Sequence, residues 1–170
     1  ARAAAGVPAR RAMENSPSSG QWLHAAGAMC TALAMVTRAA AQANRELGVL
    51  DADRAAAIST ACDEIIEGKL RRHFVVDMIQ GGAGTSTNMN ANEVIANLAG
   101  GGVHANDHVN MGQSSNDVFP SAVHLAALDV AQNELLPALK LLERSFARKA
   151  KSFQNVVKSG RTHLMDAVPV

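Results

Sequence analysis

Apolar residues recur every three or four positions from Gln21 to Leu47, and this period predicts a long amphipathic helix. Gly48 follows as a stop signal at the C-terminal end of that helix. Asp51 then offers an N-cap for a second apolar-faced segment, which Gly68 ends. The pattern therefore predicts two consecutive helices in the first part of the chain.

The next part of the chain is richer in glycine and in polar residues. The segment 73–80, HFVVDMIQ, contains a β-branched run but has no neighbouring strand pattern, so we predict an extended connector. Asn90 and Glu93 have capping-box spacing, and the glycines at 100–102 predict the end of a short helix. Polar loops, one of them over residues 81–90, are expected on both sides of this helix.

After Asp117 the sequence predicts about 35 helical residues, with Pro120 tolerated in the first turn. Large apolar residues recur there at steps of three, four and seven, as in the seam of a helix bundle. They are Leu125, Leu128, Leu135, Leu139, Leu142, Phe146 and Phe153. Pro137 is expected to kink or divide this helix, because proline removes a backbone hydrogen bond and clashes with the preceding turn.

The composition adds little charge to this picture. Of the 170 residues, 48% are hydrophobic and 18% are charged, and the formal net charge is +1. An alanine-rich chain of this kind suits a helical protein whose surface is largely covered by copies of itself. The charge gives no basic field for nucleic acid, and no apolar run has transmembrane length. We therefore expect neither nucleic acid nor a membrane as a partner.

The two cysteines predict a reducing compartment. Cys30 and Cys62 each lie in an apolar, alanine-rich pattern and lack a C-x-x-C partner. We interpret both as small buried hydrophobic residues. Together with the absence of an apolar signal-like run at the start of the sequence, this favours a cytoplasmic protein.

Two polar segments could bind a ligand through neutral groups. In GGAGTSTNMN, residues 81–90, glycines allow close approach to the backbone, but the Gly-Lys-Ser/Thr of a phosphate-binding loop is missing. Ser114, Ser115 and Asn116 precede a predicted helix N-terminus, where unpaired N–H groups and the helix dipole favour an anion. Taken alone, a flexible connection and simple N-capping explain the two segments equally well.

Histidines occur in two further polar segments. His104, Asp107 and His108 suggest a metal site at first, but no matching ligands appear downstream, so we predict no metal. In KSGRTHLMDAVP, residues 158–169, His163 is expected in a loop. A lone histidine is more often structural than catalytic, and both interpretations stay open here.

In combination, three polar blocks resemble the class II fumarase and aspartase superfamily. They read GGAGTSTNMNANEVIAN, NDHVNMGQSSNDVFP and GRTHLMDAVP. The Ser-Ser-Asn-Asp form at 114–117 is similar to fumarases, whereas aspartases usually carry Thr at the second position. The resemblance covers nearly the whole chain and implies an all-α fold. It implies an N-terminal helical domain over residues 1–112 and the first part of a long central helix bundle over residues 113–170.

The activity that this resemblance implies is the reversible anti addition of water to fumarate, giving L-malate, with no organic cofactor or essential metal. Matched position by position, the residues expected to hold the substrate carboxylates are Thr85, Ser114, Ser115, Asn116 and Thr162. Such donors stabilise the charge that builds on a carboxylate when a base removes the neighbouring proton. His163 matches the histidine that positions and polarises the water, a role suited to neutral imidazole.

The resemblance also implies a second dicarboxylate site near the surface, formed by His104, Asn106 and Asp107. Here Ala105 replaces a usual proline, and Gly101 stands where fumarases often have arginine. The loop that supplies the family's catalytic base serine lies beyond Val170. We therefore do not expect the 170-residue chain to be a competent enzyme by itself.

The sequence thus favours a cytoplasmic class II fumarase of the tricarboxylic acid cycle. The resemblance implies a homotetramer whose active sites draw residues from several subunits. Two alternatives stay open: an aspartate ammonia-lyase, which differs in its amine leaving group, and a catalytically inert helical oligomer protein.

Overall fold

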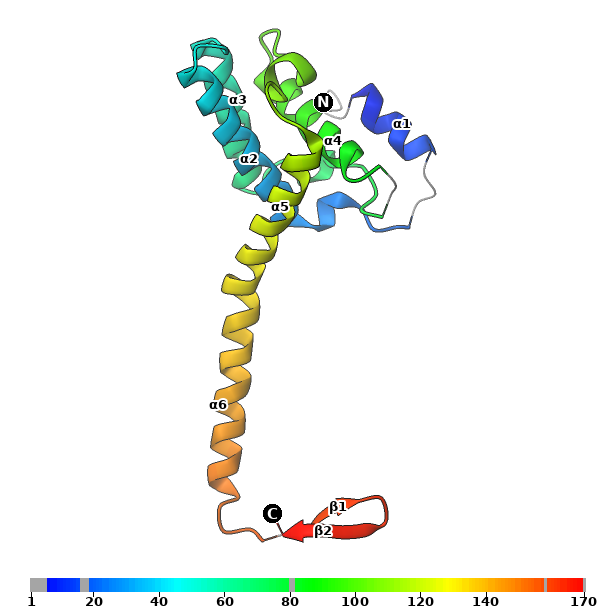
Figure 1. Cartoon of the computed structure of the whole chain (residues 1–170), viewed down its shortest axis with the longest axis vertical. Helices are drawn as coiled ribbons and strands as arrows, with labels where there is room; N and C mark the ends of the chain where they lie inside the picture. Colours follow the sequence, from blue (N-terminus) through cyan, green and yellow to red (C-terminus); the bar gives the residue numbers. More distant parts are fainter. Residues whose placement is uncertain (1–5, 16–18, 80–81, 158, 170) are drawn as a thin grey trace. The chain divides into compact units, whose positions relative to one another are not determined.

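The computed structural model describes residues 6–15, 19–79, 82–157 and 159–169, which fall into two units, Ala1–Asp129 and Val130–Val170. The first unit is built from helices, which confirms the predicted fold class (Figure 1). In chain order they are α1 (Val7–Asn15), the 3₁₀ turn η1 (Leu23–Ala25), α2 (Gly27–Glu46), α3 (Ala52–Ile66), the 3₁₀ turn η2 (Arg71–His73), α4 (Thr85–Ala99), the π-helical turn η3 (Ala105–Val109) and α5 (Ser115–Val130).

Helices α2 and α3 pack side by side, and the predicted signals between them are confirmed (Figure 1). Gly48 has a φ of 73° directly after α2, a conformation that favours glycine. Asp51 caps α3, because its carboxylate accepts a hydrogen bond of 2.9 Å from the backbone N–H of Arg54. This bond is the main reason why the pKa of Asp51 lies below its usual value.

The predicted start of the first helix at Gln21 is wrong, and so is the expectation that the segment 73–80 has no partner. The two segments pair with each other instead: the backbone N–H of Leu23 donates to the carbonyl of Val76 at 2.9 Å, and that of Met78 donates to Gln21 at 2.7 Å. Because these backbone groups are already satisfied by a distant segment, the α-helix begins only at Gly27.

The core of the first unit is apolar and includes both cysteines, as predicted. Its largest fully buried apolar side chains are Phe74, Leu33, Ile58, Ile65, Ile95, Val76, Val94 and Val109. Burial raises the pKa of Cys30 to about 11 and that of Cys62 to about 12, because a thiolate is poorly solvated in this environment.

Helix α4 begins at Thr85, so the predicted capping box and most of the predicted loop 81–90 are wrong. Asn90 and Glu93 lie inside the helix and are buried. The Glu93 carboxylate instead accepts hydrogen bonds from the backbone N–H groups of Gly6 and Ala9, at 3.0 and 3.3 Å. Glu93 therefore stabilises the N-terminus of α1, where a negative charge is favourable. The glycines at 100–102 end α4 as expected.

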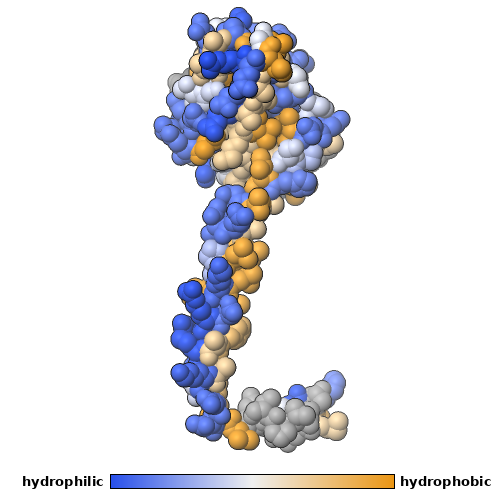
Figure 2. Space-filling model, turned by 60° about the vertical axis from the view of Figure 1, so that its left-hand side comes forward, coloured by the Kyte–Doolittle hydropathy of each residue, from blue (hydrophilic) through white to orange (hydrophobic). Residues whose placement is uncertain are grey.

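The second unit contains one long helical stretch and a hairpin. The π-helical turn η4 (Ala131–Leu135) leads into α6 (Leu136–Ser152), so the irregularity expected at Pro137 takes the form of a wide turn directly before it. The predicted apolar seam is exposed along α6, and Figure 2 shows it as a stripe. Leu139 is 49% exposed and Phe146 is 67% exposed.

The segment expected as a loop after α6 forms an antiparallel hairpin of β1 (Ser159–Thr162) and β2 (Met165–Pro169). Thr162 pairs with Met165, which leaves His163 and Leu164 as a two-residue turn. No helix among the described residues is long and apolar enough to cross a membrane.

Candidate functional site

The N-terminal turns of α4 and α5 lie against each other. Gly84, the N-cap of α4, has a φ of 83°, and an ideal Cβ placed on it would lie 2.2 Å from Cγ of the Phe119 ring. The Nδ2 of Asn88 on α4 donates a hydrogen bond of 2.8 Å to Oγ of Ser115, the first residue of α5. Since each N-terminal turn presents unpaired backbone N–H groups, two neighbouring turns favour a bound anion.

Four of the residues that the sequence predicts to hold carboxylates lie at these two helix ends. Thr85 is the first residue of α4 and is exposed. Ser114 directly precedes α5, and its Oγ accepts a hydrogen bond of 3.2 Å from the backbone N–H of Asn116. Ser115 is half-buried, whereas Ser114 and Asn116 are exposed. The site therefore combines neutral hydroxyl and amide groups with two helix N-termini, and Ser114 also takes part in capping.

A network of side-chain amides supports the segment that carries the two serines. The Oδ1 of Asn110 accepts hydrogen bonds from Nδ2 of Asn88 at 3.1 Å and from Nδ2 of Asn92 at 3.0 Å. Asn110 in turn donates to the backbone carbonyl of Gln113 at 3.2 Å, and the Gln113 side chain donates to the carbonyl of Val109 at 2.7 Å. The bends between η3 and α5 are thus fixed by hydrogen bonds to α4.

Sequence reasoning missed these supporting amides. Asn88 and Asn92 are four residues apart, which places them on one face of α4, and both are almost completely buried. The spacing was visible in the sequence, but only the length of α4 shows that the two residues share a helical face.

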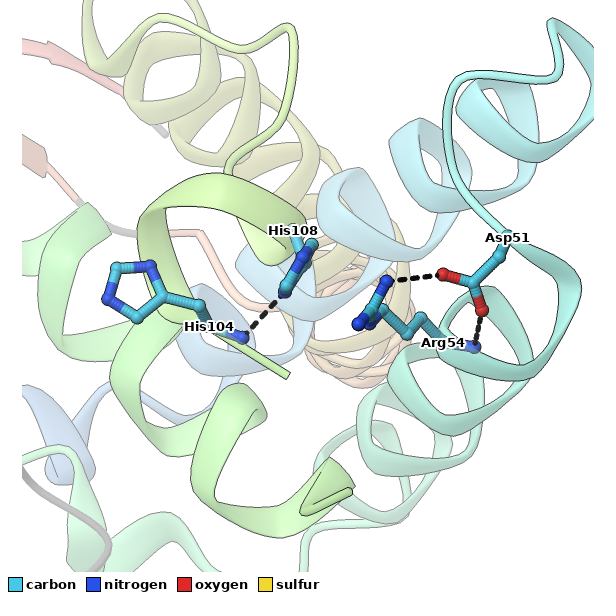
Figure 3. Close-up of polar contacts among 4 residues, drawn as sticks. All are labelled: Asp51, Arg54, His104 and His108. Carbon is cyan, nitrogen blue, oxygen red and sulfur yellow. Dashed lines mark hydrogen bonds and ion pairs between the residues drawn. The ribbon is translucent and has the colours of Figure 1, made fainter. Parts of the chain in front are cut away.

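The residues of the expected second dicarboxylate site share the π-helical turn η3 or immediately precede it. Nδ1 of His104 lies 3.3 Å from the backbone nitrogen of Asp107 and 3.1 Å from its carboxylate. Nδ1 of His108 accepts a hydrogen bond of 2.8 Å from the backbone N–H of His104 (Figure 3). An accepting Nδ1 carries no proton, so the proton of neutral His108 belongs on Nε2. The side chains of His104, Asn106 and Asp107 are exposed.

The turn η3 is not a metal centre by its composition. Within the described ranges, no group of three or more histidine, cysteine, aspartate or glutamate side chains could hold a metal ion. Beside the turn, Figure 3 also shows Asp51 accepting hydrogen bonds from the backbone and the guanidinium of Arg54, a contact that stabilises the start of α3.

Thr162 and His163 belong to the second unit. Thr162 ends strand β1, and His163 occupies the first position of the turn, where it is exposed. The φ of His163 is 51°, in the left-handed region that non-glycine residues rarely adopt. A residue held in this conformation at a turn places its side chain at the tip of the hairpin, and such strain is frequent at functional positions.

Comparison with known proteins gives consistent similarities along the chain. A model of the lyase family matches residues 7–170. The class II fumarate hydratase of Corynebacterium glutamicum is 54% identical over 164 residues, and the aspartate ammonia-lyase of a Bacillus species is 47% identical over 175 residues. These matches cover 95% and 97% of this chain, but only 34% and 37% of the respective relatives. The chain thus spans about a third of the length of these relatives.

Solved structures resemble this chain over almost its whole length. The fumarate lyase:delta crystallin from Brucella melitensis in native form has a TM-score of 0.93 and 50% sequence identity, covering 99% of this chain and 41% of that one. The recombinant class II fumarase from Schistosoma mansoni has a TM-score of 0.91 and 36% identity, covering 99% of this chain and 37% of that one.

Proposed function

The chain belongs to the lyase family, and on this premise we propose that the complete protein is a class II fumarate hydratase that interconverts fumarate and L-malate. The observation that carries the proposal is the meeting of the N-terminal turns of α4 and α5, which gathers neutral hydrogen-bond donors around one place. The 54% identity to a class II fumarate hydratase supports the same activity.

The proposed chemistry needs a site for a charge that grows during the reaction. In the dehydration of malate, a base removes the proton beside a carboxylate, and negative charge builds on that carboxylate. Donors fixed in advance around the charge lower the barrier, because they need no rearrangement when the charge develops. Two paired helix ends and the hydroxyl groups of Thr85, Ser114 and Ser115, with the amide of Asn116, suit this task.

We assign different roles to the two residues of the hairpin. Thr162 is proposed to contact a substrate carboxylate, and His163 to orient and polarise the water that is added or released. An imidazole that is neutral near pH 7 can accept a proton from water or return one. The exposed position of His163 at the tip of the hairpin is suited to reach a substrate held by other segments.

The complete protein is proposed to be a cytoplasmic homotetramer of the tricarboxylic acid cycle, with active sites shared between subunits. The exposed apolar stripe of α6 supports self-association, because an apolar helix face of this length is unfavourable in water. His104, Asn106 and Asp107 are proposed to form a second, surface dicarboxylate site, since they cluster at η3 with exposed polar groups.

An aspartate ammonia-lyase is the second candidate, because one relative with that name is 47% identical over 175 residues. Both reactions yield fumarate, so the same carboxylate contacts serve either enzyme and the leaving group separates them. The catalytically inert helical oligomer is the third possibility.

The test follows the ultraviolet absorbance of fumarate in solutions of the complete purified protein. L-Malate and L-aspartate are supplied in separate assays. We expect fumarate from L-malate and none from L-aspartate. Formation of fumarate from L-aspartate alone would reassign the protein as an ammonia-lyase, and no reaction with either substrate would support the inert form.

A further inference from the structure

Asn88 has an unusual position for a polar residue. It lies in the first turns of α4 and is only 1% exposed. Its side-chain nitrogen donates one hydrogen bond to Oγ of Ser115 at 2.8 Å and another to Oδ1 of Asn110 at 3.1 Å. The amide is thus buried next to a hydroxyl group that the proposed function places against a substrate carboxylate.

The orientation of this amide is fixed by its neighbours. Asn110 presents Oδ1 toward α4, because its Nδ2 donates to the backbone carbonyl of Gln113 at 3.2 Å. That oxygen also accepts from Asn92 at 3.0 Å. A flipped Asn88 would place its own oxygen against the oxygen of Asn110, which is repulsive. The nitrogen of Asn88 is therefore the atom that faces both partners.

The chemistry of the two groups then decides what the hydroxyl of Ser115 can do. A serine hydroxyl offers one proton and can accept two hydrogen bonds, whereas an amide nitrogen only donates. Asn88 consequently occupies an acceptor position of Ser115 and cannot take its proton. In the part of the chain that the structure describes, Ser115 Oγ makes no other hydrogen bond, so its proton remains available to a ligand.

We infer that Asn88 is a positioning residue that directs the hydroxyl proton of Ser115 toward a substrate carboxylate. This inference rests on the proposed function, in which Ser115 binds a dicarboxylate. Asn88 itself is too deeply buried to be the binding group, and it acts through Ser115. Without the bond from Asn88, the hydroxyl is free to rotate and must be ordered again whenever a carboxylate binds.

A double-mutant cycle on the complete protein tests this role. Calorimetry would measure the Kd of succinate, a dicarboxylate without a double bond or leaving group, for wild type, Asn88→Ala, Ser115→Ala and the double variant. We expect Asn88→Ala to raise the Kd by about threefold to tenfold, the usual range for one lost hydrogen bond. In the Ser115→Ala background the same change is expected to have less than about a twofold effect, because the group it acts through is gone.

Asn90→Ala is the matched control. Asn90 is equally buried on α4, but its amide bonds the backbone of His73, Val75 and Val76 and does not contact Ser115. Its effect on the Kd is expected to be the same in both backgrounds. An equal loss from Asn88→Ala in both backgrounds, or no loss at all, would overturn the inference.

Similar-sized variants keep the test decisive if Asn88→Ala does not assemble. Asn88→Asp converts the donor facing Ser115 into an acceptor, and Asn92→Asp places the same charge in the same network without touching Ser115. We expect the first to weaken succinate binding several-fold more than the second, and equal effects would contradict the inference. Wild-type protein that binds succinate but does not act on L-malate would contradict the proposed function alone. Absence of succinate binding would contradict both.

Discussion

The close contact between Gly84 and Phe119 makes a quantitative prediction. In Gly84→Ala, the new Cβ would meet Cγ of Phe119 at 2.2 Å and both Cδ atoms at 2.5 Å. Carbon atoms pack at about 3.5 Å or more, so the ring must retreat by more than about 1 Å. Overpacking of this kind costs about 1–3 kcal/mol, and a left-handed φ costs a non-glycine residue about 1–2 kcal/mol more.

We therefore expect Gly84→Ala to destabilise the complete protein by about 2–5 kcal/mol. Urea unfolding would measure the loss, at one fixed protein concentration because the stability of an oligomer depends on concentration. Gly48→Ala is the matched control: Gly48 has a φ of 73°, but nothing lies within 4 Å of its ideal Cβ. It should show only the backbone cost, about 1–2 kcal/mol.

A second comparison isolates the ring. In a Phe119→Ala background, Gly84→Ala should cost no more than Gly48→Ala, because the clash has been removed. The contact also holds the first turn of α5, so Gly84→Ala should weaken succinate binding while Gly48→Ala does not. Equal unfolding midpoints for Gly84→Ala and Gly48→Ala in the presence of Phe119 would refute the reasoning.

Further measurements test the site and the first unit. Ser115→Ala should lower turnover of L-malate on the order of a hundredfold through loss of a fixed donor. His163→Asn should lower turnover to a similar degree, and asparagine tolerates the left-handed φ at this turn, so an unchanged rate would contradict a role in proton transfer. Cys30 and Cys62 should resist alkylation by iodoacetamide at pH 7.5 in native protein and react after unfolding, because burial raises both thiol pKa values. The raised pKa values also mean that the native state keeps protons that the unfolded state loses, so the urea midpoint should fall as pH rises above about 9. Asp51→Ala should lower the thermal midpoint more than Asp51→Asn, which keeps a capping oxygen, and equal losses would show that capping is unimportant here.

The features predicted best from the sequence are those determined by neighbouring residues. Gly48 and Asp51 act on helix ends within three residues of themselves, so their signals hold in the structure. The start of α5 at Ser115 is equally local. These predictions succeed because the hydrogen-bonding groups at a helix end are satisfied by the residues beside it.

The features that were mispredicted depend on distant partners. Asn90 and Glu93 have capping-box spacing, but residues three apart are also neighbours inside a helix, and only the position of Gly6 and Ala9 shows which role applies. The late start of α2 likewise depends on backbone bonds between residues far apart in sequence.

The hairpin was missed for a different reason. Its turn begins with His163 in a left-handed conformation, a position usually marked by glycine or asparagine, so the sequence carries no turn signal there. Among the candidate site residues, the sequence placed Ser114, Ser115 and Asn116 at a helix end, but it could not indicate that Asn88 touches Ser115.

The buried asparagines of α4 have a consequence for the order in which the protein folds. Their amides bond to residues 14–27 positions away in sequence, so the helix cannot satisfy them by itself. Until those partners are in place, each buried amide would lose water without gaining a bond. Helix α4 should therefore form together with its surroundings, and its backbone N–H groups should exchange with solvent deuterium only when the whole first unit opens.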